Sequence, residues 1–379
     1  MWYLLPARMR SIIKALFNPT IYPTVLQIEP TNRCNLKCIM CPHGCEKMTE
    51  YHDLEITRFK EIVDEIYKYG FLRGVHIQGL GEPLLYRNLI EAIGHCKKRN
   101  LETYFNTNLT ILTRDLAEEL VEIQHNKIAV SLDTVSSNTY KWIRRGGKAY
   151  DLERVLNNMK MLAEVKREKN SKYPIIAVHA ILFRSTIEEI PDMAKVLKEH
   201  GAEMLCYQHL ITEGIPEQKK TPDGRRLIDE CVTKLSLEEK KEILSIMRSF
   251  SSQEFEIVPP HDFEWLDKTL PPLEGILTCL DLWERPTILA NGDFMPCCYA
   301  LGYKHLHMGN IYRDSFIDIW LSKRYRNLRW QHISGRLNEV CANCSQLYQV
   351  FQPSVKLYLS GELKRYRFYP NPFFGNRSN

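Results

Sequence analysis

Long apolar runs, internal repeats and an excess of charge of one sign are all missing from this 379-residue sequence. No stretch approaches the roughly 20 apolar residues of a membrane-spanning helix, and the N-terminus lacks the continuous apolar core of a signal peptide. Lys and Arg number 51 against 46 Asp and Glu, a balance too even to indicate binding of nucleic acid or acidic lipid. With 44% hydrophobic residues, the composition predicts a globular cytoplasmic protein with one large and one smaller domain.

The N-terminal segment, residues 1–21, is a local exception. Apolar residues recur there at helical spacing, and Arg8, Arg10 and Lys14 supply the only charges. A short basic amphipathic helix of this kind either packs on the body of the protein or contacts a membrane surface. The second alternative leaves membrane association and a lipid substrate open.

Twelve cysteines are many for a cytoplasmic chain, and they cluster instead of spreading as a disulfide framework. Cys34, Cys38 and Cys41 have the spacing CxxxCxxC and follow an apolar, strand-like run. Three thiolates at this spacing can bind three irons of a 4Fe–4S cubane and leave the fourth iron open to another ligand. Zinc sites normally have four protein ligands, often with histidine among them, so this triplet favours iron.

Extended and helical segments alternate between residues 25 and 210. Strands are expected at 25–31, 74–81, 102–108, 127–134, 175–183 and 203–210, with helices that include 57–69, 114–123, 152–169 and 187–200. Parallel neighbours need crossover connections, so these βα units predict a parallel sheet covered by helices. Six units in place of eight predict an α/β fold, a partial (β/α)6 TIM barrel.

The expected strands are polar on one face. The residues of that face are Gln27, Glu29, Thr31, His76, Gln78, Tyr104, Asn106, Asn108, Ser131, Asp133 and His179. A packed barrel is filled by branched apolar side chains, so a polar face predicts an open lumen that holds a polar ligand.

A second group of cysteines follows residue 275. Cys297 ends a Gly-x4-Cys turn, and Cys279 precedes it, while Cys341 and Cys344 form a CxxC pair. Four thiolates saturate either an iron–sulfur cluster or a structural zinc ion, and both alternatives remain open. Cys298 is an alternative ligand to Cys297.

Gly79-Leu80-Gly81-Glu82-Pro83 comes directly after the second expected strand. Together with the first cysteine triplet, this motif resembles the radical S-adenosylmethionine (SAM) superfamily, whose GGEP motif it matches except at Leu80. The resemblance implies that Gly79, Gly81, Glu82 and Pro83 approach the methionyl amino group of SAM. It also implies SAM contacts from Asn106, Asn108, Ser131 and Asp133, and from Arg154 at the SAM carboxylate, with Arg144 the less favoured candidate.

The late cysteines resemble the twitch domain, a shortened form of the SPASM auxiliary-cluster domain. No cysteine follows Cys344, so the resemblance implies one auxiliary cluster, held by Cys279, Cys297, Cys341 and Cys344. The implied cofactors are SAM and two 4Fe–4S clusters. The expected domains are the segment 1–21, a radical SAM barrel 22–212, a connecting region 213–275, a twitch-like domain 276–350 and a tail 351–379.

The resemblance implies an enzyme that cleaves SAM reductively to a 5′-deoxyadenosyl radical, which abstracts hydrogen from a C–H bond. The ligand pattern is similar to that of aminocyclitol dehydrogenases, which makes oxidation of a hydroxylated small molecule the leading expectation. The alternatives are radical modification or carbon–carbon bond formation on a sugar-bearing or archaeal-type lipid, and maturation of a peptide. A non-catalytic iron–sulfur electron carrier is the alternative of another class.

Candidate catalytic residues lie near the end of the sixth expected strand and in the lumen. They are Cys206, Tyr207, His179 and His209, and His76 and Gln208 are expected to contribute to substrate specificity. A histidine is expected to accept the hydroxyl proton of an alcohol substrate, because imidazole titrates near neutral pH. The expected partners are a small-molecule or lipid substrate and a reducing protein such as ferredoxin or flavodoxin.

Overall fold

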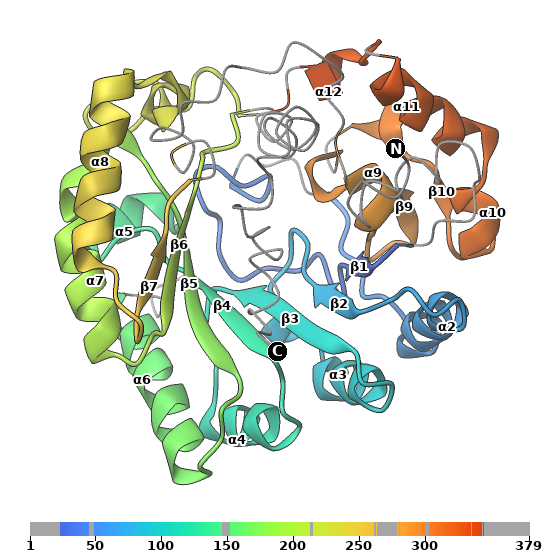
Figure 1. Ribbon diagram of the computed structural model, residues 1–379, viewed down its shortest axis with the longest axis horizontal. Helices are drawn as coiled ribbons and strands as arrows, with labels where there is room; N and C mark the ends of the chain where they lie inside the picture. The colour runs from blue at the N-terminus through green and yellow to red at the C-terminus, as the bar shows by residue number, and fades with distance from the viewer. Residues whose placement is uncertain are drawn as a thin grey trace, which may run out of the picture. The chain divides into compact units, whose positions relative to one another are not determined.

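A computed structural model describes residues 23–44, 49–145, 152–212, 215–260, 263, 279, 281–300, 303–334, 336–342 and 344. The predictions for the N-terminal segment 1–21 and for the tail 351–379 lie outside these residues. The described part of the chain forms two compact units. One contains residues from 28–56 and 76–269, and the other contains residues from 1–27, 57–75 and 270–379. Figure 1 shows the elements of both units.

The larger unit, 28–56 with 76–269, contains the parallel strands expected from the sequence. β3 (Glu102–Thr107), β4 (Lys127–Ser131), β5 (Ile175–Ile181) and β6 (Met204–Gln208) pair in parallel in chain order. β1 (Val25–Ile28) and β2 (Gly74–Ile77) precede β3 in the strand order. Buried apolar residues on one face of each strand alternate with the polar face that the sequence predicts.

Helices alternate with these strands and lie outside β4 to β7 in Figure 1. They are α3 (Leu89–Lys97), α4 (Arg114–Glu122), α5 (Ser137–Ile143), α6 (Leu152–Glu168), α7 (Ile190–Glu199) and α8 (Leu237–Phe250). Each longer helix buries one apolar face, as α6 does with Val155, Met159 and Leu162. The α/β class and the partial barrel are therefore confirmed.

A seventh parallel strand lies in the region that the sequence analysis assigned to a connection. β7 (Glu256–Val258) pairs with β6 through Cys206 and Val258. Three residues are too few to show a period of two, so the pattern could not reveal this strand. Helix α8 precedes this strand, and a capping box at Ser236 and Glu239 starts the helix.

The smaller unit, 1–27 with 57–75 and 270–379, is built around short antiparallel strands. β8 (Thr287–Ile288), β9 (Asp293–Met295) and β10 (Gly309–Asn310) form a meander. Gly292 makes the β8–β9 turn with φ of +85°, a conformation that favours glycine. The helices of this unit are α2 (Ile56–Tyr67), α9 (Asp281–Glu284), α10 (Phe316–Trp320), α11 (Lys323–Ile333) and α12 (Glu339–Ala342).

Helix α2 is fastened to the C-terminal part of this unit by charged side chains. The Glu65 carboxylate accepts from the backbone N–H groups of Phe316 and Ile317 at 3.4 and 3.2 Å, and Arg58 donates to the carbonyl of Ile311. A carboxylate at the first turn of α10 satisfies N–H groups that the helix itself leaves without partners. None of the helices among the described residues combines the length and apolarity that a bilayer crossing needs.

Candidate functional site

The first cysteine triplet lies in a loop after β1 that the end of α5 holds from the side. The backbone N–H groups of Lys37 and Ile39 donate to the carbonyls of Arg145 and Ile143 at 2.5 and 2.9 Å. Cys34, Cys38 and Cys41 belong to this loop, which we call the cysteine loop (residues 34–44). None of the eleven cysteines that the structure describes forms a disulfide.

Arg144 joins the cysteine loop to the end of β4. Its guanidinium donates through Nε and Nη2 to Asp133 Oδ2, both at 2.7 Å, and Nη1 lies 3.8 Å from Cys38 Sγ. Asp133 Oδ1 accepts from the N–H of Ile181 at 2.8 Å. Both side chains are buried, so the pair is largely shielded from water.

Arg154, the favoured candidate for the SAM carboxylate, lies exposed near the start of α6. Arg144 is the arginine that the structure places against the cysteines. We therefore move the proposed SAM-carboxylate contact from Arg154 to Arg144. The sequence offered no local signal for this choice, because the partners of Arg144 come from segments far away in the chain.

Burial dominates the chemistry of the three thiols. It raises the pKa of Cys34 to about 11 and that of Cys41 to about 12, and it raises the pKa of Cys38 as well. The charges of Cys38 and Cys34 raise the pKa of Cys41 further. Thiolates so disfavoured on their own need a positively charged partner such as iron.

The GLGEP motif is shaped by the strand beside it. A Cβ at Gly79 would lie 2.3 Å from Glu29 Cγ, and one at Gly81 would lie 2.0 Å from the carbonyl oxygen of Thr31. Leu80 N also donates to Glu29 Oε1 at 2.6 Å. Protein atoms alone therefore already require glycine at both positions, and the approach of this motif to SAM stays a prediction.

Glu82 is buried and ties this motif to the end of β3. Its Oε1 accepts from Thr107 Oγ1 at 2.6 Å and from Leu84 N at 3.1 Å, while Oε2 accepts from Asn108 N at 2.7 Å. Burial raises the pKa of Glu82 to about 7. Pro83 follows as the first residue of a short 3-10 helix, Pro83–Leu85.

Asn108 connects β3 to the cysteine loop. Its Nδ2 donates to Asn35 Oδ1 at 2.9 Å, and Asn35 Nδ2 donates to Thr110 Oγ1 at 2.8 Å. Asn35 lies directly after Cys34, so this amide network fixes the first residue of the triplet. Sequence reasoning assigned Asn108 to SAM and did not find its bond to Asn35.

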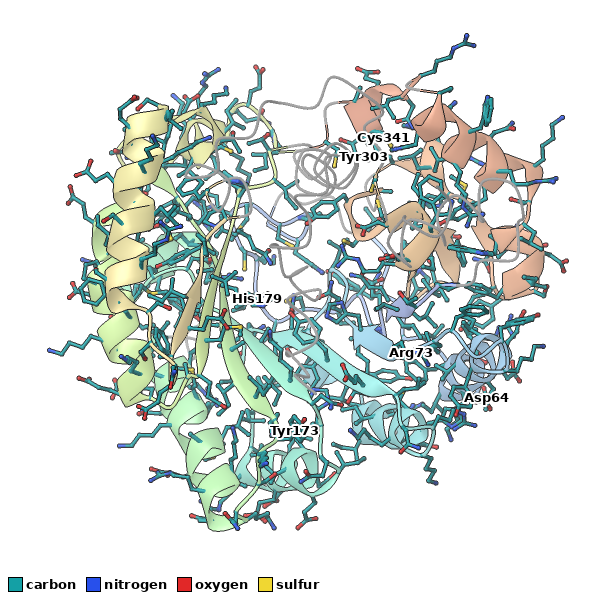
Figure 2. All side chains as sticks on the ribbon, in the orientation of Figure 1. Asp64, Arg73, Tyr173, His179, Tyr303 and Cys341 are labelled. Atoms are coloured by element: carbon teal, nitrogen blue, oxygen red, sulfur yellow. The ribbon has the colours of Figure 1, made fainter. Side chains whose placement is uncertain are left out.

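The lumen face carries a chain of polar side chains. In the register, Ser131 pairs with His179 and His179 pairs with Cys206, so the three share a face. Gln208 Nε2 lies 3.4 Å from His179 Nδ1, and His179 lies 3.3 Å from the hydroxyl of Tyr104. Figure 2 shows His179 on the side of β5 away from the helices.

Tyr104 stands at the centre of this chain. Its hydroxyl donates to Asn106 Oδ1, and its ring centroid lies 3.8 Å from that of His76. The Nζ of Lys127, at the start of β4, lies 5.7 Å from the same ring centroid. The structure thus adds Lys127 to the predicted lumen residues, which already included Tyr104.

The four candidate catalytic residues do not lie together. His179 and Cys206 share the lumen face, but Tyr207 alternates to the other face, where its register partner is Ala180. His209 is buried beyond the end of β6, with its ring 6.1 Å from that of Phe263. Burial, assisted by Lys127, lowers the pKa of His179 to about 3. The expectation that His179 titrates near neutral pH is therefore wrong.

The segment 215–231 supports the cysteine loop. Ile39 of the loop belongs to a buried apolar cluster with Phe183, Ile215, Leu227 and Cys231 among its members. Lys219 Nζ donates to the carbonyl of Gly44 at 2.7 Å.

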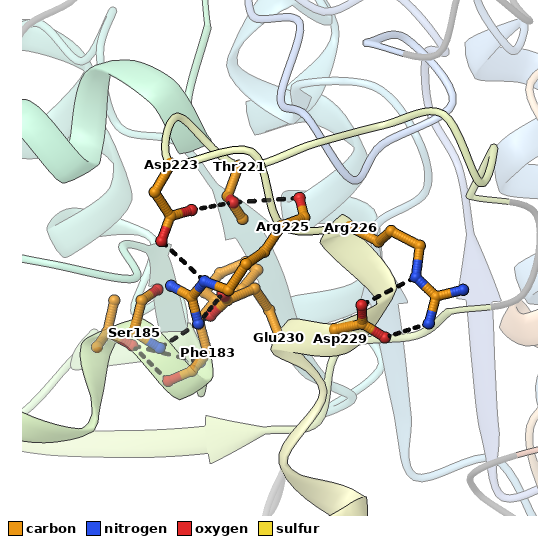
Figure 3. A network of polar contacts seen from close by, with 9 residues as sticks. Phe183, Ser185, Thr221, Asp223, Arg225, Arg226, Asp229 and Glu230 are labelled. Carbon is orange, nitrogen blue, oxygen red and sulfur yellow. Dashed lines mark hydrogen bonds and ion pairs between the residues drawn. The ribbon is translucent and has the colours of Figure 1, made fainter.

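Charged contacts hold this segment to the end of β5. Buried Glu230 accepts from Ser185 N at 2.8 Å and pairs with Arg225 at 3.1 Å. Arg225 also donates to Asp223 at 2.8 Å, as Figure 3 shows. The segment is therefore an ordered support and not a simple linker.

The late cysteines form the second site, within the smaller unit. Burial raises the pKa of Cys279, and the charges of Cys341 and Cys344 raise it further. Burial also raises the pKa of Cys297, and the charges of Cys298 and Cys279 raise it further. Asn338 Nδ2 donates to Cys341 Sγ at 3.3 Å.

Cys298 differs from Cys297 in its partners. Its pKa, raised to about 12 mainly by burial, also responds to Asp281, to Arg285 and to a hydrogen bond with Gln27. Arg285 in turn pairs with Asp281 at 2.6 Å. We keep Cys297 as the proposed ligand, because Cys298 already has protein partners.

The donor chemistry of both sites fits iron–sulfur clusters. The cysteines of each site are buried or half-buried and form no disulfide, and cluster irons are bound by thiolates. Within the described ranges, no group of three His, Cys, Asp or Glu side chains meets the geometry of a single-ion site.

Comparison with known proteins gives two family matches. Residues 28–203 match the Radical SAM superfamily, and residues 279–345 match the SPASM iron–sulfur cluster-binding domain. The cofactor-modifying protein of the tungsten-containing aldehyde ferredoxin oxidoreductase of Pyrococcus furiosus is 24% identical over 84% of this chain and 86% of its own length. The PqqA peptide cyclase of Bradyrhizobium diazoefficiens is also 24% identical, over 85% and 78%.

Among solved structures, Streptococcus suis SuiB bound to its precursor peptide SuiA is similar with a TM-score of 0.64 at 18% identity, covering 90% of this chain and 74% of SuiB. These matches confirm an enzyme that uses SAM and a 4Fe–4S cluster and binds further iron–sulfur through its C-terminal part. The chain belongs to the radical SAM superfamily and carries a SPASM domain.

Proposed function

We propose that this chain abstracts a hydrogen atom from a C–H bond of a peptide and that its C-terminal iron–sulfur site relays an electron during the reaction. When bound, SAM and the first cluster supply the 5′-deoxyadenosyl radical. The protein supplies position and shelter from water.

The chain's own residues have separate tasks in this proposal. Cys34, Cys38 and Cys41 hold the first cluster, while Arg144 fixes Cys38 and faces the SAM carboxylate. The lumen chain of Gln208, His179, Tyr104 and Asn106 presents hydrogen-bonding groups to the substrate. Because the pKa of His179 is about 3, its ring stays neutral at physiological pH and acts as a hydrogen-bonding group.

The observation that carries the peptide assignment is the match, across most of the chain, to proteins named for peptide substrates. PqqA cyclase and SuiB with its precursor peptide both belong to this group. Support for a hydroxylated small molecule is weaker, since the neutral, buried His179 is a poor base for an alcohol. The Pyrococcus furiosus relative, in contrast, is named for modifying a cofactor.

Deuterium transfer distinguishes these substrate classes. Anaerobically reconstituted enzyme with SAM and dithionite is offered a library of deuterated synthetic peptides or a panel of deuterated cyclitols and sugars. We expect deuterium in the 5′-deoxyadenosine only with peptides, read by mass spectrometry. Deuterium from the cyclitols alone would contradict the proposal, and the triple change of Cys34, Cys38 and Cys41 to Ala serves as the control without SAM cleavage.

A further inference from the structure

Helix α11 exposes two cations, Lys323 and Arg326, on one face. Its exposed residues Lys323, Arg326, Asn327 and Trp330 fall on one face at helical spacing, and the opposite face buries Tyr325, Leu328, Arg329 and His332. The sequence of α11, KRYRNLRWQHI, contains no acidic residue. We call the exposed set the α11 face.

Helix stability does not explain these charges. Lys323 is the first residue of α11 and Arg324 the second, at the end where the helix dipole is positive. Cations there cost about 0.3–1 kcal/mol, whereas acidic side chains would stabilise the helix. Lys323 and Arg326 make no side-chain hydrogen bond or ion pair with any residue in the described part of the chain. Their charge is therefore available to a partner.

Trp330 adds an apolar contact to this charged face. Its exposed fraction is 64%, the highest among the large hydrophobic residues recorded as exposed in the described ranges. Tryptophan and arginine are enriched at the centres of protein interfaces, where lysine and aspartate are depleted. An exposed indole on the same face as two cations is suited to a protein partner with an acidic rim.

The buried face of α11 leads to the second cysteine site. The Tyr325 hydroxyl donates to the carbonyl of Pro296 at 3.4 Å, next to Cys297, and the charges of Cys297 and Cys279 act on Tyr325. The guanidinium of Arg329 lies 4.1 Å from the Tyr325 ring centroid and 4.0 Å from that of Trp320. One helix thus faces solvent with cations, and on its other side it bonds to the backbone next to Cys297.

We propose that the α11 face is the docking surface for an acidic electron-carrier protein of the ferredoxin or flavodoxin type. This inference rests on the electron relay in the proposed function and adds the place where the partner binds. Charge complementarity selects the partner, since opposite potentials steer association and small acidic carriers match a cationic face. A centre docked there lies one side-chain layer from the auxiliary cysteines.

The test is binding of a purified acidic 4Fe–4S ferredoxin, and of a flavodoxin in a second arm, to the reconstituted full chain. We expect the double variant Lys323→Glu with Arg326→Glu to lose at least about tenfold in affinity, and Trp330→Ala about as much. Wild-type affinity should fall as salt rises from about 0.05 to about 0.5 M, because the Debye length shortens. The double variant should lose most of this dependence.

Lys241→Glu, an exposed lysine on α8 in the other unit, is the matched control and should bind like wild type. Equal losses in Lys241→Glu and in the double variant, or no loss in the double variant, would overturn the docking surface. A third result would also overturn it. The wild type would bind anionic phosphatidylglycerol vesicles and no carrier, and the double variant would lose the vesicle binding.

Two further measurements separate folding and function from docking. Lys323→Glu places an anion at the start of α11, so its urea midpoint should not fall. With dithionite as the reductant, the double variant should form 5′-deoxyadenosine at the wild-type rate. Failure of that reaction in the wild type too would count against the proposed function and leave the binding result to decide on the α11 face.

Discussion

Arg144 is the residue on which most contacts of the first site converge. Its bidentate bond holds Asp133, which in turn fixes the backbone of Ile181, and its remaining Nη lies beside Cys38. A buried ion pair adds little net stability, but removing one partner leaves an uncompensated charge. Lysine cannot replace arginine here, because its single ammonium group lacks the several N–H donors that the planar guanidinium presents in fixed directions.

We expect Arg144→Ala to destabilise the protein by about 3–5 kcal/mol, because Asp133 would remain buried without its partner. The cluster that depends on Cys38 should be lost more readily, seen as lower iron per chain and less 5′-deoxyadenosine. Arg144→Lys should keep part of the stability and lose most of the SAM cleavage.

Arg154→Ala is the control for this residue, since Arg154 lies exposed on α6. Its effect on unfolding in anaerobic urea titrations should stay within about 0.5 kcal/mol. If Arg154→Ala abolished SAM cleavage while Arg144→Ala did not, the original assignment of the SAM carboxylate to Arg154 would be restored.

At the scale of elements, the cysteine loop depends on the segment 215–231. Leu227 is fully buried in the apolar cluster that also contains Ile39, between Cys38 and Met40. Leu227→Ala should cost about 2–5 kcal/mol, because it leaves a cavity under the loop. Release of iron from the first cluster to a chelator should become faster.

Leu237→Ala is the control for Leu227→Ala, because it makes the same substitution at an exposed leucine. Leu237 begins α8 and is 47% exposed, so its loss should have little effect on unfolding or on iron release. Equal iron release from both variants would show that the segment does not support the loop.

Hydrophobic periodicity predicted the elements that have enough residues to show it. Strands β1 to β6 and helices α4 and α6 lie where the sequence placed them, although the strands end one to four residues earlier. The cysteine spacings predicted the family, which the comparisons confirm. Strand β7 and the support by 215–231 could not be predicted, because both depend on contacts between distant segments.

The same limit applies to the site residues. Strand parity placed His179, Cys206 and Asn106 on one face, as observed, but Tyr207 was included for its position and lies on the other face. The shift of the His179 pKa follows from burial and from Lys127, neither of which a strand pattern reveals. Local patterns therefore identified the face, and only the packed structure gives the chemistry of its residues.

For the molecule as a whole, buried neutral histidines set the response to acid. Burial lowers the pKa of His125 and of His179 to about 3, and that of His332 to about 4. The unfolded chain binds protons at these histidines near pH 6.5, and the folded chain does so only at much lower pH. Their contribution to stability is therefore complete above about pH 6.5 and is lost as pH falls below it.

We expect the free energy of unfolding to fall below pH 6.5 by about 1.4 kcal/mol per pH unit for each such histidine. In anaerobic urea titrations between about pH 6.5 and 4.5, His125→Asn should lower this slope by about 1.4 kcal/mol per pH unit, the contribution of one histidine. His52→Gln, which changes a ring at the surface, should leave it unchanged. An identical slope in His125→Asn and wild type would show that His125 is not the neutral, buried group described here.

The glycines of the GLGEP motif have a consequence for how such sequences diverge. Gly79 and Gly81 are required by Glu29 and Thr31 of the neighbouring strand, whatever the loop beside them binds. In a descendant that had lost its cysteines and its chemistry, the need to fold would still retain both glycines. The motif would then persist as a record of ancestry, and only the cysteines would distinguish a working enzyme from an inactive copy.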